Sequence, residues 1–329
     1  MKKILLIFNL LLLSVLSGCI HNLNEIIDHT EDHVILTYSV QFYVENSVYY
    51  EYNEKFNSYV KVPKNPEKLY YIFDGWFDSL GSKLDPKKSY NSNIKFYAKF
   101  SFDYVLANNT IQTKIISSNV KINTYVYDLG FLGWSHINQG YGSGSGVIID
   151  LFQDYFIVLT NAHVTYNHGR SHIIIDVIDY KGNAYKAYKM EDSELLEYDL
   201  SLIYFKKTSI SYNIIQIAQD NPNIGEIAIS IGQPGGQNNS VTYGTIMKYT
   251  KINEYKEGSS FEPPEFNVMQ HNAPTAPGSS GGVILNDKLM LIGLHFAGST
   301  DSFGNFAFGY AIPVGKIREY LKLFNFIPE

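Results

Sequence analysis

Cysteine is almost absent from this 329-residue sequence, which has Cys19 as its only one. A single cysteine excludes an intramolecular disulfide, so the folded part of the chain depends on its core alone. The sequence also has no long basic run, and its formal net charge is −6, which argues against a nucleic-acid partner. It has neither a His-Glu-x-x-His helix nor a phosphate loop, so we expect no metal and no cofactor.

Apolar and aromatic residues, by contrast, are plentiful. Hydrophobic residues make up 45% of the chain and tyrosine occurs 27 times, which indicates a folded, β-rich protein rather than a disordered one. The length allows one large domain or two modest ones, with additional segments at the ends.

The N-terminus has the order of a secretory signal: a basic start (Lys2-Lys3), an apolar middle (Ile4–Leu13) and small residues at the end (Leu16-Ser17-Gly18-Cys19). The apolar stretch is shorter than the roughly 20 residues of a spanning helix. Its ending resembles the bacterial lipobox, in which the cysteine becomes the lipidated first residue after cleavage. We expect residues 1–18 to be removed and Cys19 to anchor the protein on the extracellular face of the cell membrane. An uncleaved anchor and an ordinary signal peptide are the alternatives.

Residues 19–37 are polar and mixed in charge, as in a tether. His29 and His33 have a metal-binding spacing there, but no further ligand is near, so a solvated linker is the favoured interpretation. From residue 38 to 100 the pattern changes to short β-type runs: Val40–Val44, Tyr59–Val62, Ile72–Phe77 and Ile94–Phe100.

The aromatic-Asp-Gly-Trp-aromatic segment Phe73–Phe77 and the closing run Phe96–Phe100 resemble an internalin-type B-repeat (Listeria–Bacteroides repeat). That family is a small β-grasp-like module of bacterial surface proteins, and the resemblance implies a spacer or weakly adhesive role. We expect Trp76 and its aromatic neighbours to form a core rather than a ligand platform.

A second pattern covers residues 120–329, after a connector at 101–119. It has many β-branched and aromatic runs bounded by turns, which suggests paired β-barrels. One helix is predicted, from Val314 to about Phe324, where Ile317, Tyr320 and Leu321 fall at helical spacing.

Three motifs follow one another in this region. Thr160-Asn161-Ala162-His163-Val164 places a histidine after a buried strand, and Asp199-Leu200-Ser201-Leu202-Ile203 places an aspartate at the mouth of an apolar strand. Pro277-Gly278-Ser279-Ser280-Gly281-Gly282 contains a serine between glycines. Glycine permits the tight backbone that lets N–H groups point at a developing oxyanion.

These motifs resemble those of the trypsin-like (chymotrypsin-fold) serine proteases, in particular the HtrA-type and glutamyl-endopeptidase branches. The order His–Asp–Ser is that of the chymotrypsin class. Phe308–Pro313 also looks like the last strand and helix start of HtrA-type domains. The resemblance implies a mainly β fold, a chymotrypsin-like double β-barrel with a C-terminal helix, preceded by the small β-grasp-like module.

The expected roles follow from the chemistry of a serine endopeptidase. Ser280 attacks the scissile carbonyl, His163 takes its proton, and Asp199 holds the imidazole and stabilises its charged form. The N–H groups of Gly278 and Ser280 form the oxyanion hole. His168 and His172 lack a matching context. The acidic run with Glu191, Asp192 and Glu197 is interpreted as solvated surface.

The substrate pocket is expected between the segment before Ser280 and the strand Leu291–Gly298. Pro274 stands where a preference for Lys or Arg needs an acid, which disfavours basic specificity. In glutamyl endopeptidases a threonine and a histidine at the offsets of Thr275 and His295 bind the substrate carboxylate. Those enzymes also use a free N-terminal amine, whereas the mature N-terminus here is lipidated and more than 100 residues away in sequence.

His295 has two alternative roles. It is either a carboxylate ligand or a packed strand residue beside a pocket for small apolar side chains, as in HtrA-type enzymes. Phe296-Ala297-Gly298 should pair with the substrate backbone as an added strand. The polar insertion Asn253–Ser260 is expected near the cleft.

Two other functions are alternatives to a surface lipoprotein protease. One is an adhesion or binding lipoprotein that keeps the protease fold without activity. The other is a quality-control protease of the HtrA type, which is disfavoured because no PDZ domain is expected after Glu329. Protein or peptide substrates and the membrane are the expected partners, and the oligomeric state is open.

Overall fold

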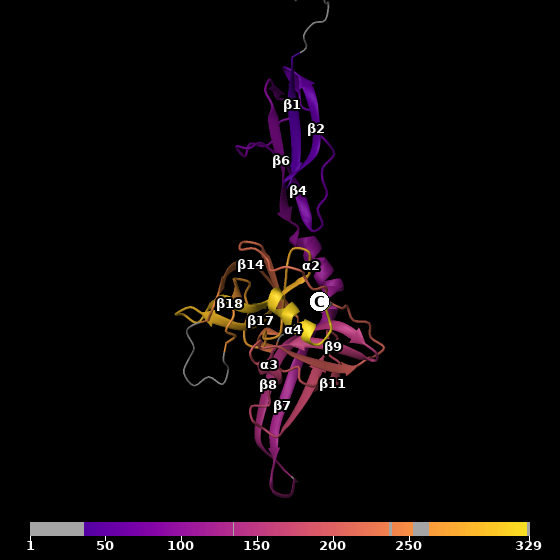
Figure 1. The fold of residues 1–329 in the computed structure, drawn as a ribbon, viewed down its shortest axis with the longest axis vertical. Coiled ribbons are helices and arrows are strands. Elements are labelled where there is room, and N and C mark those ends of the chain that lie inside the picture. Colours follow the sequence, from indigo (N-terminus) through magenta and orange to yellow (C-terminus); the bar gives the residue numbers. More distant parts are fainter. Residues whose placement is uncertain (1–35, 134, 237–238, 253–262, 328–329) are drawn as a thin grey trace, which may run out of the picture. The chain divides into compact units, whose positions relative to one another are not determined.

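The computed structural model describes residues 36–133, 135–236, 239–252 and 263–327. The chain divides into two compact units, which meet in sequence between Ser101 and Phe102. The ribbon in Figure 1 is coloured along the chain, so that the first unit is indigo to purple and the second runs from magenta to yellow.

The first unit is built on a mixed four-stranded sheet in the order β2-β1-β6-β4. Its central strands β1 and β6 run parallel, with Val40 opposite Ile94, and β2 pairs with β1 as an antiparallel hairpin. A separate pair, β3-β5, completes the unit. The strands are β1 (Thr37–Val44), β2 (Ser47–Lys55), β3 (Ser58–Tyr59), β4 (Tyr71–Phe77), β5 (Ser89–Tyr90) and β6 (Ile94–Phe102).

Aromatic side chains fill the core of this unit. Trp76 is buried, and its ring lies 4.8 Å from that of Phe42 and 5.4 Å from that of Phe73. Trp76 is therefore a core residue, as the aromatic pattern predicted. The strand expected at Tyr59–Val62 is wrong beyond Tyr59, because the chain leaves the β3-β5 pair there.

The second unit contains two closed six-stranded barrels. The first barrel runs in the order β10-β11-β12-β9-β8-β7. Its long hairpin β7-β8 is the magenta ribbon in Figure 1. The strands are β7 (Asn119–Leu129), β8 (His136–Phe152), β9 (Tyr155–Thr160), β10 (His172–Ile178), β11 (Ala184–Lys189) and β12 (Ser201–Lys206).

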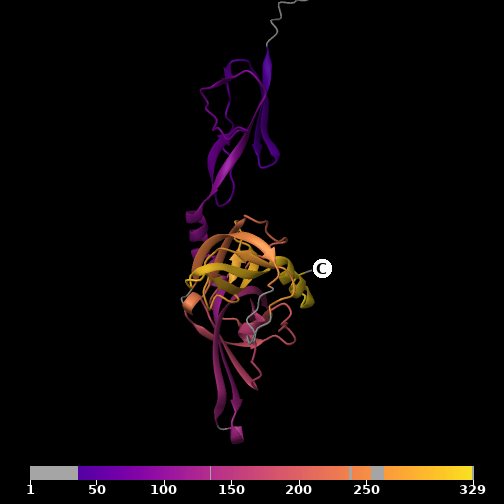
Figure 2. The ribbon, with the colours of Figure 1, turned by 90° about the vertical axis from the view of Figure 1, so that its left-hand side faces the viewer.

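The second barrel runs in the order β13-β14-β15-β18-β17-β16, and Figure 2 shows it as the orange to yellow strands. Its strands are β13 (Ile227–Gly232), β14 (Ser240–Thr250), β15 (Val268–His271), β16 (Val283–Leu285), β17 (Leu291–Thr300) and β18 (Phe306–Pro313). Because each barrel is closed, every one of its strands pairs with a neighbour on both sides over at least part of its length.

The predicted fold class, a mainly β chymotrypsin-like double barrel with a C-terminal helix, is confirmed. Helix α4 (Val314–Leu323) lies within one residue of its predicted span and buries Ile317, Tyr320 and Leu321. The Tyr320 hydroxyl donates to the carbonyl of Ser193, which fastens the helix to the segment before Asp199.

Short helices between the strands were not predicted. The segment 101–119, expected as a connector, contains helix α2 (Tyr104–Thr113) and the 3₁₀ turn η1 (Ile115–Ser118), and both belong to the second unit. Asp103 caps α2 by accepting from the Leu106 N–H, a local signal that marks a helix start. The remaining short elements are α3 (Ala162–Thr165), η2 (Phe131–Gly133) and η3 (Pro234–Gly236).

The two barrels have separate apolar interiors. In the first barrel, Ile122, Ile148, Val158, Ile203 and Phe205 are fully buried and pack together. Burying each such side chain contributes roughly 1.5–3 kcal/mol relative to leaving it exposed. The loops at the strand ends are thereby held by rigid strands, and these loops carry the motif residues.

Candidate active site

His163 and Asp199 come together because their strands are neighbours. Strand β9 pairs with β12 so that Thr160 lies opposite Ser201, and the two motif residues follow and precede these positions. His163 Nδ1 lies 2.9 Å from Asp199 Oδ2 and 3.0 Å from Oδ1. The two predicted residues are thus in hydrogen-bonding contact.

The carboxylate of Asp199 is buried, with 1% of its surface exposed, so it must be hydrogen-bonded. Besides the imidazole, the backbone N–H of His163 donates to Oδ1 at 3.0 Å. Asn161 Nδ2 donates to the Asp199 carbonyl at 3.0 Å. Asp199 has φ of +50°, a left-handed conformation that aspartate tolerates better than most residues. Both the side chain and the backbone of Asp199 are therefore held by the segment that carries His163.

Ser280 lies in the connection between β15 and β16 of the second barrel. Its hydroxyl donates to the Phe296 carbonyl at 3.2 Å. Its own carbonyl accepts from the Ser145 N–H of β8 at 2.7 Å, a bond between the two barrels. The Ser280 turn is thus fastened directly to the barrel that carries His163 and Asp199.

The glycines around Ser280 are required by close backbone contacts. A Cβ on Gly281, which has φ of +81°, would lie 2.0 Å from the Ser145 carbonyl oxygen. A Cβ on Gly278, with φ of +99°, would lie 2.5 Å from the Gln233 carbonyl oxygen. Only glycine fits at these two positions.

The N–H groups of Gly278 and Ser280 are the predicted oxyanion donors. Neither has a hydrogen-bond acceptor among the described residues, whereas the intervening Ser279 N–H donates to the Ala276 carbonyl at 3.0 Å. Two backbone donors in one turn, both without an intramolecular acceptor, are what an oxyanion hole requires.

The predicted pocket residues lie around strand β17. Thr275 faces Gly298, since a Cβ on that glycine would lie 3.7 Å from Thr275 Oγ1. Phe296 is buried, and Ala297 and Gly298 pair with β18 on one side, whereas the pairing of β16 with β17 extends no further than Leu294. Among the described residues, Ala297 and Gly298 therefore have β18 on one side, and the pairing of β16 with β17 does not reach them on the other.

His295 lies inside the second barrel, with 3% of its surface exposed. Its Nδ1 is 3.3 Å from Nε2 of His271, which is fully buried on β15. Burial lowers the pKa of His271 to about 4. Burial, followed by the charges of His271 and His163, lowers the pKa of His295 well below its usual value. Burial therefore favours the neutral form of both imidazoles.

Two histidines and three acidic residues to which the sequence analysis assigns no catalytic role are exposed. His168 is exposed in a loop, and His172 begins β10 with its ring stacked on Tyr127 at 5.0 Å. The acidic residues Glu191, Asp192 and Glu197 are all exposed.

Sequence reasoning gave no role to Asn161, Ser145 or His271, although each contacts a motif residue. Asn161 lies in the histidine motif, and Ser145 lies in the run Gly142–Gly146, so both were near a visible signal. His271 had none, because only the pairing of β15 and β17 through β18 brings it to His295.

Some predicted features lie outside the described residues. These are the signal sequence 1–18, the lipidation site Cys19, most of the tether and the polar insertion 253–260. In the part of the chain that the structure describes, we find no helix with the length and apolarity to cross a membrane.

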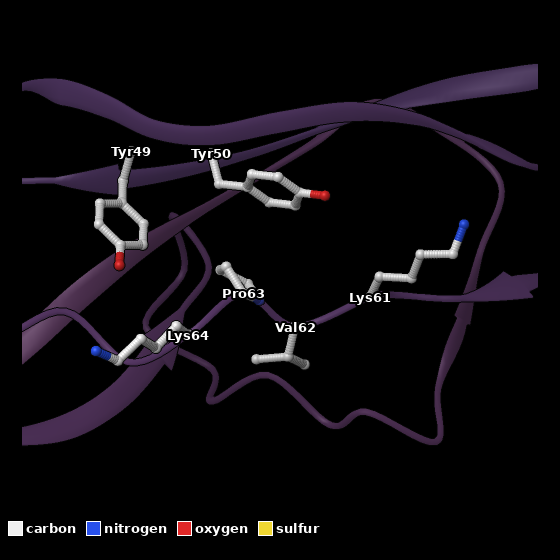
Figure 3. Close-up of a pocket in the computed structure, with 6 residues that line it drawn as sticks. All are labelled: Tyr49, Tyr50, Lys61, Val62, Pro63 and Lys64. Atoms are coloured by element: carbon white, nitrogen blue, oxygen red, sulfur yellow. The ribbon is translucent and has the colours of Figure 1, made fainter.

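The first unit carries one shallow hollow of note, and Figure 3 shows its lining. Two tyrosines of β2 face a segment that follows β3. The lining residues are Tyr49, Tyr50, Lys61, Val62, Pro63 and Lys64. None of them is a histidine, serine or carboxylate, so the hollow lacks a nucleophile with a paired base.

Comparison with known proteins agrees with this geometry. Residues 144–294 match the family model described as the trypsin-like peptidase domain. That range includes His163, Asp199 and Ser280. Together with the double barrel, the match supports a serine endopeptidase with the chymotrypsin fold.

Several curated serine proteases are similar to this chain. A probable periplasmic serine endoprotease, DegP-like, of Buchnera aphidicola subsp. Baizongia pistaciae is 30% identical over 175 residues, which is 53% of this chain and 35% of that protein. The putative serine protease HhoA of Synechocystis is 30% identical over 178 residues, 54% of this chain and 41% of that protein. The periplasmic pH-dependent serine endoprotease DegQ of Escherichia coli is 30% identical over 177 residues, 54% of this chain and 36% of that protein.

The relatives support the HtrA type among chymotrypsin-fold proteases. The chain spans between about a third and two fifths of the length of these curated relatives. The similarity therefore concerns the peptidase domain.

The buried histidine pair predicts a pH-dependent stability. Between pH 6.5 and about 4 the imidazole of residue 271 binds a proton in the unfolded chain but not in the folded one, so stability falls as the pH drops through this window. The expected contribution of His271 is about 3 kcal/mol, from a pKa lowered to about 4 at 1.36 kcal/mol per unit. Urea unfolding at pH 7, 5.5 and 4 measures it.

His271→Asn should be less stable than the wild type at pH 7 but lose less on acidification. His172→Asn, at an exposed histidine, is the control and should keep the wild-type pH dependence. An unchanged pH dependence in His271→Asn would show that the pair does not titrate on unfolding.

Proposed function

We propose that this protein is a surface-anchored serine endopeptidase that hydrolyses peptide bonds with Ser280 as nucleophile, His163 as base and Asp199 as the residue that orients the base. The observation that carries the proposal is the contact of His163 Nδ1 with the buried Asp199 carboxylate at 2.9 Å. The Ser280 turn is bonded to the same barrel through Ser145.

The contact with Asp199 fixes the tautomer of the base. A proton on His163 Nδ1 donates to the carboxylate, which leaves the lone pair on Nε2 to accept a proton. The buried carboxylate also stabilises the imidazolium once that proton has been taken. His163 then gives the proton to the leaving amine.

Substrate binding frees the nucleophile in this scheme. In the free protein the Ser280 hydroxyl donates to the Phe296 carbonyl. A substrate strand that pairs with Phe296–Gly298 brings its own N–H to that carbonyl. The hydroxyl is then released to donate to His163, and its oxygen attacks the scissile carbonyl. The N–H groups of Gly278 and Ser280 receive the resulting oxyanion, each donor contributing roughly 3 kcal/mol to the transition state.

Two substitutions test the proposed chemistry. Asp199→Asn should lower kcat by about four orders of magnitude, because the imidazole is then held in the wrong tautomer. Ser280→Ala should abolish the turnover that depends on the nucleophile. Casein and peptide cleavage measure both, and His172→Asn serves as an active control.

A wild-type protein without cleavage would contradict the proposal. Binding to cells or matrix that survives in Ser280→Ala would then favour the alternative, an adhesion lipoprotein with a protease fold.

We propose further that Glu or Asp is preferred before the scissile bond. Thr275 Oγ1 lies near Gly298 of the proposed pocket, and Pro274 provides no acid for a basic side chain. A proton on His271 Nε2 that donates to His295 Nδ1 leaves His295 with a proton on Nε2. A hydroxyl and an imidazole N–H are suitable donors to a substrate carboxylate.

Cleavage of a peptide library reports this preference directly. The expected result is a kcat/KM for Glu that exceeds that for Gln by at least tenfold, about 1.4 kcal/mol. Thr275→Val should reduce the ratio, because it removes one donor and keeps the shape. A dominant preference for small aliphatic residues would overturn the acidic specificity and leave the catalytic proposal intact.

We also propose that Cys19 is lipidated after removal of residues 1–18, and that the B-repeat-like module at 38–100 acts as a spacer on the outer face of the membrane. The support is the signal-like order of the N-terminus and the aromatic core of the module. The DegP-like relative of Buchnera and DegQ of Escherichia coli are both named as periplasmic proteins. An envelope location of this protein is consistent with those names.

Membrane fractionation tests the anchor. The wild-type protein should sediment with membranes and incorporate labelled palmitate. Cys19→Ala should do neither, since it removes the thiol that carries the lipid. Equal membrane recovery of the two proteins would contradict lipidation.

A further inference from the structure

Ser145 is a buried serine outside the predicted triad, and all of its polar groups are hydrogen-bonded to residues around the Ser280 turn. It lies on β8 of the first barrel and has no exposed surface. Its hydroxyl donates to the Gly278 carbonyl at 2.9 Å and accepts from the Gln233 N–H at 3.0 Å. Its N–H donates to the Ser280 carbonyl at 2.7 Å, and its carbonyl accepts from Thr160 Oγ1 at 2.7 Å.

These bonds hold the peptides next to those that carry the oxyanion donors. The N–H of Gly278 belongs to the peptide whose carbonyl is that of Pro277, and this carbonyl accepts from the Gly235 N–H at 2.8 Å. In a trans peptide the C=O and N–H point in opposite directions. The bond to Gly235 therefore turns the Gly278 N–H away from the 233–236 loop.

The Ser145 hydroxyl bonds both to the Ser280 turn and to the 233–236 loop. It holds the next carbonyl, that of Gly278, and through Gln233 it holds the start of the loop that contains Gly235. Glycine rotates more freely than other residues, so the Gly278 peptide needs such external contacts to keep one orientation. Ser145 makes one of them directly, to the Gly278 carbonyl, and the bond that it accepts from the Gln233 N–H holds the loop whose Gly235 makes another.

We propose that Ser145 is a positioning residue for the oxyanion hole. Its hydroxyl couples the first barrel to the Gly278 carbonyl and the Gln233 N–H of the second, and thereby orients the Gly278 N–H. The inference rests on the proposed function, because an oxyanion hole acts only in a protease that has a nucleophile. Ser145 is fully buried, so it acts through the turn and not on the substrate.

The size of the expected effect follows from what the hydroxyl does. Loss of one oxyanion donor costs about 10²- to 10³-fold in kcat. Removing a residue that orients a donor leaves the donor in place but less well aligned, so we expect roughly a tenfold decrease.

The test compares Ser145→Ala with Ser118→Ala in the full-length protein. Ser118 is also fully buried, and its hydroxyl donates to the Ile115 carbonyl within η1 and not to a residue of the Ser280 turn. Four quantities are measured: kcat and KM for one peptide substrate, the affinity for a peptide aldehyde with the same sequence, and the affinity for the cleaved product. The product used is the half that carries the new amino terminus, which has no new carboxylate to occupy the oxyanion hole.

We expect Ser145→Ala to lower kcat and the affinity for the aldehyde by the same factor, about tenfold. KM and the affinity for the product should stay within twofold, because neither depends on the oxyanion donors. Ser118→Ala should leave all the values within twofold of the wild type. Ser145→Cys is the second variant for the case in which the alanine variant does not fold, because cysteine keeps a side chain of similar size but is only a weak hydrogen-bond donor and acceptor.

The outcomes separate the inference from the proposed function. A wild-type protein that cleaves the peptide, with a serine-145 variant of unchanged kcat and aldehyde affinity, overturns the role of Ser145 alone. A decrease shared by Ser118→Ala, or one that appears equally in KM and product affinity, shows a general loosening and also overturns it. A wild-type protein that cleaves no peptide overturns the proposed function, and the inference with it.

Discussion

The buried carboxylate of Asp199 is the constraint on which the geometry of the site depends. A carboxylate with 1% of its surface exposed needs hydrogen-bond donors, and the structure provides the imidazole and the backbone N–H of His163. Satisfying this one group therefore fixes the position and the tautomer of the base. Asn161 holds the backbone carbonyl of Asp199, whose backbone is in the left-handed conformation.

The second constraint is the junction between the barrels. Each barrel closes on itself, so His163 and Asp199 of the first barrel and Ser280 of the second are held together by contacts across the junction. The bonds of Ser145 to Ser280, Gly278 and Gln233 bridge this junction with neutral hydrogen bonds. Close contact across it also explains Gly281, whose position beside the Ser145 carbonyl leaves no room for a Cβ.

The sequence predicted the fold class and the C-terminal helix because their signals are local. Periodicity over a few residues indicates a strand or helix, and the histidine, aspartate and serine motifs can each be found in a short window. The same local reasoning extended a strand from Tyr59 to Val62, where only Tyr59 is paired. It also missed β2, whose exposed side chains lack a clear alternation of buried and exposed positions.

Contacts between strands that are distant in sequence could not be predicted from short motifs. The pairing of β15, β18 and β17 decides that His271 meets His295, and the meeting of β8 with the Ser280 turn decides that Ser145 contacts Gly278. Neither register is encoded within a motif. The proximity of Thr275 and Gly298 likewise depends on contacts outside any motif, and the substrate preference stays a prediction.

The most direct test of the account is to locate the adduct of a fluorophosphonate on the full-length protein by peptide mass spectrometry. The reagent is attacked by an activated serine, so the adduct identifies the nucleophile without any knowledge of the natural substrate. The account predicts a single adduct on Ser280 that is lost in His163→Ala. An adduct on another serine, or none on the folded wild-type protein, would contradict it.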